Sequence, residues 1–185
     1  MDIGWIVPLF YANVFANGVL LLGTIWSIAL PERRAYPMRA KGASYYSMWL
    51  LFDFIILSNL ALVVLDWNTG PLSAELRFLI GGPILVLGAA FLIWGITTLG
   101  ITNTSGVRDG FVARGPYAIS RNPQYVGDFF LFAGIVIVAN SEVVLITHVL
   151  TSLVLLLSPL AEERWLEGEY GDEYMTYRRS VPRFL

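Results

Sequence analysis

The sequence contains no cysteine, a single histidine and few charges, which make up 14% of its 185 residues. Without cysteine there are no disulfide bonds, thiolate nucleophiles or cysteine-based metal sites. His148 lies in an apolar stretch without companion ligands, so we expect it to be structural and predict no metal site. The net charge is only −2 and no basic block is present, so nucleic acid is not an expected partner.

The scarcity of charge accompanies a high apolar content. Hydrophobic residues make up 56% of the chain, against the roughly 45–50% apolar and 25% charged residues of average soluble domains. A membrane-crossing helix needs about 20 apolar residues, so 185 residues allow several spans and little outside the bilayer. We therefore predict an all-α, polytopic membrane helical bundle with the lipid bilayer as its partner, forming one domain over residues 1–185.

The apolar segments predict about five transmembrane helices. Three lie at residues 4–30, 44–65 and 76–99, and together form a three-span scaffold over residues 1–99. A fourth apolar stretch, residues 123–158, would be about 54 Å long as one helix, well beyond the roughly 30 Å hydrocarbon core. Because Asn140-Ser141-Glu142 interrupts it, we predict a helical hairpin. Glycines in the third segment favour close helix packing: Gly81, Gly82, Gly88 and Gly95.

The basic residues predict an orientation. Only Arg77 of the twelve lies after an even-numbered span; the others follow spans one, three and five. Because basic loops stay in the cytoplasm, we expect the N-terminus outside and the long loop and C-terminus cytoplasmic. The eleven on this side are Arg33, Arg34, Arg39, Lys41, Arg108, Arg114, Arg121, Arg164, Arg178, Arg179 and Arg183.

The polar loop before the hairpin contains Gly115-Pro116-Tyr117 and then Ser120-Arg121-Asn122-Pro123-Gln124-Tyr125. One interpretation is ordinary helix punctuation, with Asn122 as the N-cap, Pro123 in the first turn and Gly-Pro forming a turn.

The tail predicts an amphipathic helix, with Leu166, Tyr170, Tyr174, Tyr177 and Val181 forming a stripe that lies against the membrane or the bundle. Glu162 falls on the same stripe, where a carboxylate is costly unless it meets a positive partner. Pairing with Arg121 or Arg164 is the simplest explanation.

Together, these segments resemble the isoprenylcysteine carboxyl methyltransferase family and its phospholipid methyltransferase relatives. The resemblance covers roughly residues 100–185: Gly-Pro-Tyr, an Arg-Asn-Pro-x-Tyr motif opening a hairpin, a Glu pair, and Tyr-Gly-x-x-Tyr-x-x-Tyr before Val-Pro. It implies a cytoplasm-facing pocket for S-adenosyl-L-methionine formed by the loop, hairpin entrance and tail. The cofactor-binding positions that it implies are Asp109, Gly110, Phe111, Val112, Tyr117, Asn122, Pro123, Gln124, Tyr125 and Glu162.

Two positions depart from the prenylcysteine-specific pattern. Asn122 stands where those members carry histidine, and Ser158 stands where they carry an arginine suited to the substrate carboxylate. The second departure argues against prenylcysteine as the substrate. Substrate candidates are Arg121, Asp128, Ser158 and Asp53; for Asp53, Asp128 and the neighbouring Asn59, pairing between helices is an equal alternative.

The resemblance thus implies an integral membrane methyltransferase acting on a lipophilic or small membrane-permeant acceptor, a carboxylate, thiol or amine. No catalytic residue is assigned. Two alternatives stay open: an NADPH-dependent sterol or steroid reductase, whose families share the hairpin motif, and a non-catalytic membrane scaffold.

Overall fold

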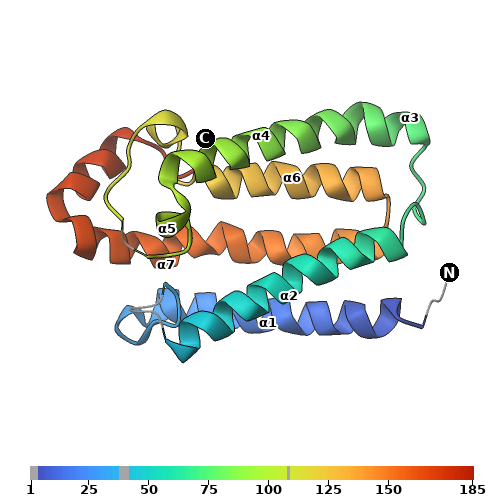
Figure 1. The fold of residues 1–185 in the computed structure, drawn as a ribbon, viewed down its shortest axis with the longest axis horizontal. Coiled ribbons are helices and arrows are strands. Elements are labelled where there is room, and N and C mark those ends of the chain that lie inside the picture. The colour runs from blue at the N-terminus through green and yellow to red at the C-terminus, as the bar shows by residue number, and fades with distance from the viewer. Residues whose placement is uncertain (1–3, 38–41, 108) are drawn as a thin grey trace.

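The computed structural model describes residues 4–37, 42–107 and 109–185, so Arg39, Lys41 and Arg108 of the predicted basic set lie outside the described residues. Every regular element in these ranges is helical, which confirms the all-α class (Figure 1). The long helices are α1 (Ile6–Ala29), α2 (Ala43–Leu65), α4 (Gly82–Leu99), α6 (Pro123–Ala139) and α7 (Glu142–Ser180). The short ones are η1 (Pro31–Arg33), α3 (Ala74–Leu76), the π-helical turn η2 (Arg77–Gly81), α5 (Ile101–Thr104) and η3 (Gly115–Ala118).

The five predicted apolar segments are all helices. Four helical stretches are long and apolar enough to cross a membrane, namely α1, α2, Ala74–Leu99 and α7. Helix α6 has 17 residues and is about 25 Å long, at the short end of what a span needs. Large apolar side chains such as Phe15, Leu50 and Leu79 are more than 70% exposed along these helices, as expected of a lipid-facing surface. The chain is an integral membrane protein.

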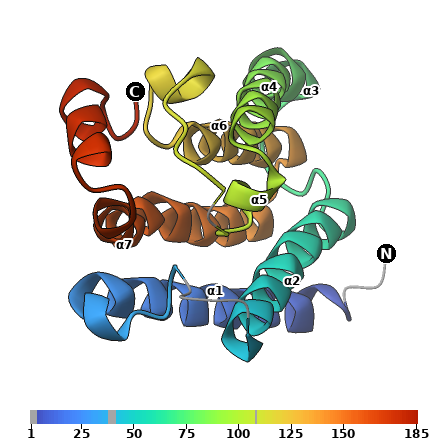
Figure 2. The same cartoon turned by 60° about the vertical axis from the view of Figure 1, so that its left-hand side comes forward.

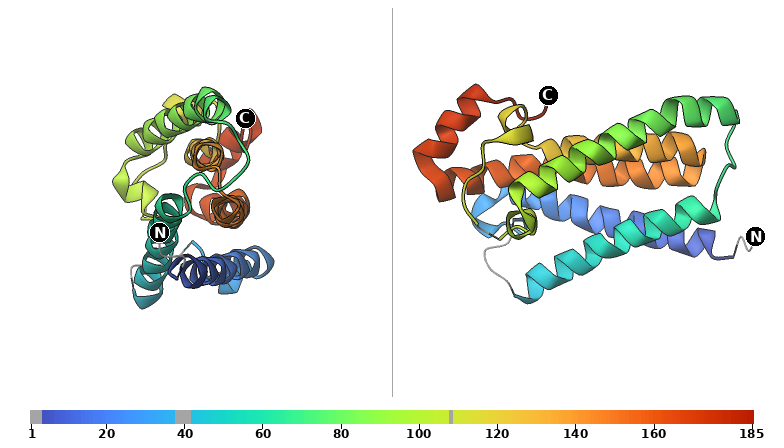
Figure 3. Two further views of the ribbon diagram at one scale, coloured as in Figure 1. Left: turned by 90° about the vertical axis from the view of Figure 1, so that its right-hand side faces the viewer. Right: turned by 45° about the horizontal axis from the view of Figure 1, so that its top comes forward.

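Helix α7 lies between two pairs of helices. It packs on α1 and α2 on one side and on α6 on the other, while α4 packs along α6 (Figures 1 and 3). The start of α1 and the C-terminus lie at opposite ends of the bundle (Figure 1). Helix α7, the second helix of the hairpin, is therefore the central helix of the fold.

Helices α4 and α6 meet along facing glycines. A Cβ added to Gly88 would lie 2.7 Å from the carbonyl carbon of Phe130, and one added to Gly127 would lie 2.5 Å from the backbone nitrogen of Leu92. Such contacts allow the two backbones to approach closely, which is how small residues pack membrane helices. The packing interpretation is confirmed for Gly81, Gly88 and Gly95, which all face α6, and is wrong for Gly82, which has no neighbouring atom within 4 Å.

Polar side chains join α1, α2 and α7 inside the bundle. Nδ2 of Asn13 donates to Oγ of Ser58 at 2.7 Å and to Oδ1 of Asn59 at 3.1 Å. Nδ2 of Asn59 in turn donates to Oγ1 of Thr151 at 3.2 Å. For Asn59, pairing between helices is therefore the observed role, and it satisfies amide groups that would be costly in lipid.

The predicted interruption at Asn140-Ser141-Glu142 is the turn of the hairpin. Asn140 adopts a left-handed conformation with φ of 51°, and Oγ of Ser141 caps α7 by accepting from the backbone nitrogen of Val144 at 3.0 Å. Nδ2 of Asn140 donates to Asn68, Gly70 and Leu72 of the loop between α2 and α3. The hairpin turn and this loop are thus fastened together at the end opposite to the C-terminus.

The tail differs from the expected separate helix. Helix α7 continues past Ser158 and Pro159 and breaks only at Gly171, which has φ of 53° and ψ of −129°. Pro159 has no backbone N–H, so one hydrogen bond of the helix is missing there, but the helix continues past it. The break at Gly171 turns the last helical segment back over the end of the bundle (Figure 2).

Candidate active site

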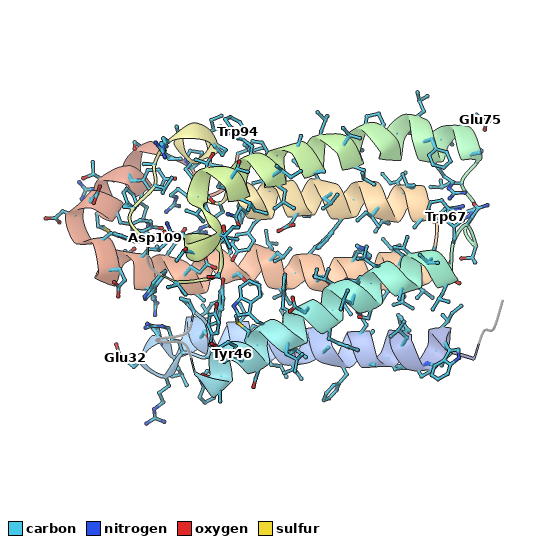
Figure 4. The ribbon with its side chains drawn as sticks, in the orientation of Figure 1. Glu32, Tyr46, Trp67, Glu75, Trp94 and Asp109 are labelled. Atoms are coloured by element: carbon cyan, nitrogen blue, oxygen red, sulfur yellow. The ribbon has the colours of Figure 1, made fainter. Side chains whose placement is uncertain are left out.

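A cavity of about 160 Å³, open to the outside, lies at the end of the bundle that holds the C-terminus. Its walls come from the loop after α1, the end of α4, α5, the loop to η3, the start of α6 and the second half of α7. Figure 4 shows Glu32, Tyr46 and Asp109 at this end of the molecule, with Trp67 and Glu75 at the other.

Glu162 on α7 is the acidic group in this cavity. Its Oε1 atom accepts hydrogen bonds from the hydroxyls of Tyr36 and Tyr125, and these two hydroxyls lie 3.0 Å apart. Burial, together with the charge of Glu162, raises the pKa of Tyr36 well above its ordinary value. The phenol therefore stays protonated and remains a donor to the carboxylate.

Tyr36 reaches Glu162 because its loop is fastened to the end of α1. Oγ of Ser27 accepts hydrogen bonds from the backbone nitrogens of Ala35 and Tyr36 at 3.0 and 2.9 Å. Sequence reasoning missed Tyr36 as a site residue, because nothing around it matches the motifs of the C-terminal part. The sequence offered one signal: the distribution of basic residues placed the loop that contains Tyr36 on the same side of the membrane as the polar loop before the hairpin.

Aromatic rings form the wall beside Glu162. The ring of Phe111 lies 5.2 Å from that of Tyr170 and 5.4 Å from that of Tyr177, between centroids. The predicted stripe of Leu166, Tyr170, Tyr174 and Tyr177 borders the cavity. Of the two expected positions, the stripe thus takes the one against the bundle, where it faces the cavity, while Val181 lies outside the lining.

Two side-chain amides of the Arg-Asn-Pro-x-Tyr motif face the loop and tail. Nε2 of Gln124 donates to the hydroxyl of Tyr117 and to Oγ1 of Thr104, both at 3.0 Å. Burial raises the pKa of Tyr117, so this hydroxyl also stays protonated. Asn122 occupies the N-cap position of α6, but its side chain makes no capping bond and donates instead to the carbonyl of Arg183 at 3.0 Å. The predicted cap is therefore wrong, and Asn122 holds the tail.

Glu163, next to Glu162, has a different environment. Its carboxylate receives a bidentate pair from Arg183 at 2.6 and 2.9 Å and lies 3.2 Å from Nη2 of Arg121 and 3.9 Å from Nη2 of Arg178. The hydrogen bond from Arg183 to Glu163 raises the pKa of that guanidinium. Arg121 thus pairs with Glu163, so its expected pairing with Glu162 is wrong.

Two nitrogen atoms of the Arg121 guanidinium have no hydrogen-bond partner among the described residues. Its Nε and Nη1 atoms are buried and make no hydrogen bond with any residue that the structure describes. The side chain is 8% exposed and lines the cavity. An anionic or hydrogen-bond-accepting group would satisfy these donors.

The cavity brings together eight of the ten predicted cofactor positions, and Arg121 with them. Asp109 and Pro123 are outside its lining: the backbone nitrogen of Asp109 donates to Oδ1 of Asn103 at 2.7 Å, and Pro123 is buried at the start of α6. The eight lining positions are Gly110, Phe111, Val112, Tyr117, Asn122, Gln124, Tyr125 and Glu162. Their roles stay predictions.

The remaining substrate candidates lie in the spans, away from this lining. Ser158 is buried and donates to the carbonyl of Val154 at 2.9 Å, Asp53 is exposed on α2, and Asp128 is partly buried on α6. Asp128 follows Tyr125 by three residues on α6, which places it one helical turn from the cavity wall. Outside residues 1–3, 38–41 and 108, no three His, Asp or Glu side chains are grouped to hold a metal ion.

The described helices and the cavity define a polytopic helical membrane protein with a candidate small-molecule site at one end of its bundle. A family model described as phospholipid methyltransferase matches residues 76–173, more than half of the chain. The chain belongs to this family and is a membrane methyltransferase. No curated protein and no solved structure matches the chain. The matched segment runs from the end of α3 to just past the break at Gly171, and so does not include Tyr36.

Proposed function

We propose that the protein transfers a methyl group from S-adenosyl-L-methionine, held in this cavity, to a lipophilic or small membrane-permeant acceptor. The observation that carries the proposal is the Glu162 carboxylate, which two phenols hold at the wall of an aromatic-lined cavity in a member of a methyltransferase family. Membership of this family favours a methyltransferase over the reductase and scaffold alternatives.

The residues of the cavity fit the cofactor in charge and shape. S-adenosyl-L-methionine carries an ammonium and a sulfonium, for which Glu162 is the counter-charge. Tyr117, Tyr170 and Phe111 supply ring faces for adenine or for a cation. The unpaired donors of Arg121 suit an anionic group, either the cofactor's carboxylate or an acid on the acceptor.

The bound cofactor supplies an activated methyl group on a good leaving group. The protein's contribution is then to bind, orient and exclude water rather than to form a covalent bond. The rings around the cavity lower its effective dielectric, so that the charges of Glu162 and Arg121 act more strongly than in water. We assign no general base, because the acceptor, whether carboxylate, thiol or amine, decides whether one is needed.

The acceptor would approach from the bilayer. Asp128 lies one turn along α6 from Tyr125, and Ser158 lies one turn before Glu162 on α7, while Asp53 is exposed on α2. Arg121 lines the cavity itself. We propose these four as acceptor contacts, with Arg121 first because it alone of the four lines the cavity.

The basic residues favour an orientation in which the cavity end faces the cytoplasm, where S-adenosyl-L-methionine is made available to membrane enzymes, and the N-terminus lies outside. Because Tyr36 joins the first loop to α7, we treat residues 1–185 as one domain in which the first three spans contribute to the site.

Equilibrium binding tests the proposal. Detergent-purified protein is expected to bind S-adenosyl-L-methionine and not NADPH. Glu162→Gln removes the counter-charge at nearly constant shape and is expected to weaken binding by tenfold or more, about 1.5–3 kcal/mol. Glu173→Gln, an exposed acid on the last helical segment, is the matched control and is expected to bind normally.

If neither ligand binds, the protein is not the proposed enzyme. If NADPH alone binds, the cofactor assignment is wrong. Methyl transfer from labelled cofactor to prenylcysteine, small thiols and phosphatidylethanolamine then identifies the acceptor class.

A further inference from the structure

Two adjacent glutamates on α7 are held in opposite ways. Three arginines surround Glu163, at 2.6 to 3.9 Å, and neutralise its charge. Glu162 has no basic side chain within ion-pair distance among the residues that the structure describes, and receives hydrogen bonds from two phenols instead. Neutral donors orient a carboxylate without cancelling its charge, which is what a site for a cationic ligand requires.

The two phenols share one oxygen of Glu162. Both hydroxyls donate to Oε1, and no described residue donates a hydrogen bond to Oε2. Glu162 itself lines the cavity. A carboxylate fixed through one oxygen in this way keeps its other oxygen available to a ligand.

Tyr36 is the donor that no motif assigns. It comes from the loop between α1 and α2, outside the segment that matches the family model, and lines the cavity with Glu162. Tyr125 belongs to the Arg-Asn-Pro-x-Tyr motif, whereas Tyr36 is brought in by the bonds from its own and the preceding backbone nitrogen to Ser27.

We propose that Tyr36 is a positioning residue of the ligand site: its phenol fixes Oε1 of Glu162, so that Oε2 faces the cation of S-adenosyl-L-methionine in the cavity. This inference rests on the proposed function. It makes the first cytoplasmic-end loop part of the binding site rather than a mere connection between spans.

The test is a double-mutant cycle on cofactor binding, which needs no turnover. Tyr36→Phe removes only the hydroxyl and is expected to raise the dissociation constant for S-adenosyl-L-methionine about tenfold, the usual effect of losing one hydrogen bond to a charged group. In the Glu162→Gln background the same substitution is expected to change binding less than about twofold, because Tyr36 acts through the carboxylate. Tyr46→Phe, an exposed tyrosine at the same end of the bundle, is the control and leaves binding unchanged.

Three outcomes would overturn the inference. Unchanged binding in Tyr36→Phe would show that Tyr125 alone fixes Glu162, and tighter binding would show that the phenol competes with the ligand. An equal loss in both backgrounds would show that Tyr36 acts independently of Glu162. In each case the proposed function would still hold, provided that the natural protein binds S-adenosyl-L-methionine and Glu162→Gln does not. If the natural protein does not bind S-adenosyl-L-methionine, both the proposed function and the role of Tyr36 are wrong.

A second variant keeps the test independent of how well Tyr36→Phe folds. Ser27→Ala leaves the phenol in place but removes the acceptor that holds its loop. We expect binding to weaken several-fold in Ser27→Ala and, again, little further change when Glu162→Gln is added. Normal binding in Ser27→Ala together with normal binding in Tyr36→Phe would refute the proposal.

Discussion

Replacing Gly88 by alanine tests the packing on which the position of α6 depends. The added Cβ would lie 2.7 Å from the carbonyl carbon of Phe130 and 2.8 Å from Cα of Leu131, and both are backbone atoms that cannot rotate away. The nearest atom, the backbone nitrogen of Leu131, would lie only 2.3 Å away, and ordinary contacts begin near 3.4 Å, so α4 and α6 would have to separate by about 1.1 Å. Overpacking costs about 1–3 kcal/mol, and a contact of 2.3 Å with a backbone atom belongs in the upper part of that range, about 2–3 kcal/mol. The better helix propensity of alanine returns about 1 kcal/mol of this cost.

The net loss of about 1–2 kcal/mol corresponds to a fall in melting temperature of roughly 2–8 °C for a chain of this size. Thermal unfolding of detergent-purified protein, followed by tryptophan fluorescence, measures it. Gly18→Ala is the matched control, since Gly18 lies inside α1 with no atom within 4 Å of the added Cβ, and its melting temperature should stay constant or rise. Equal behaviour of the two variants would refute the close approach of α4 and α6.

Three further predictions concern the charged groups, the hairpin turn and the orientation. Glu163→Gln leaves Arg121 buried without its counter-charge and should lower the free energy of unfolding by about 3 kcal/mol, whereas Glu162→Gln should weaken cofactor binding more than it lowers the melting temperature. A larger loss of stability in Glu162→Gln and a larger loss of binding in Glu163→Gln would contradict the two roles. Asn140→Ala removes four side-chain hydrogen bonds and a residue suited to φ of 51°, so we expect a loss of about 2 kcal/mol in the same assay. An unchanged melting temperature would mean that the turn does not fasten the loop after α2. Because the chain has no cysteine, Glu75→Cys and Glu173→Cys place single thiols at opposite ends, and a membrane-impermeant maleimide should label only Glu75→Cys in intact cells; labelling of Glu173→Cys alone would reverse the orientation.

The helices were predictable from the sequence, and the site only in part. Apolar length gives the spans directly, and Asn140 marks the hairpin turn because an interruption by polar residues is costly anywhere except at a membrane surface. The end of α7 was not predictable in the same way. Pro159 suggests a stop, but the helix continues to Gly171, where a φ of 53° suits glycine.

The contribution of the first loop was out of reach of sequence motifs. Tyr36 and Glu162 are 126 residues apart, and their contact depends on how α1 packs on α7 and on where Ser27 holds the loop. A motif records spacing along one segment and carries no information on such packing. The expected partnership of Glu162 with Arg121 was wrong for a similar reason, since only the tail position of Arg183 shows which of the two glutamates the arginines surround.

Glu162 and Glu163 are adjacent on α7 but face different surroundings. Successive residues of a helix point about 100° apart, so one carboxylate faces the cavity while the other faces the tail. Arg183 and Arg121 fix the tail through Glu163, and the backbone nitrogen of Arg121 donates to the carbonyl of Pro182 at 2.9 Å. Had the arginines met Glu162 instead, the cavity would contain no uncompensated negative charge and would not attract a cation. In the proposed binding mode, the tail neutralises Glu163 through its arginines, so that Glu162 keeps its charge and its hydrogen bonds from the two phenols for a cationic ligand.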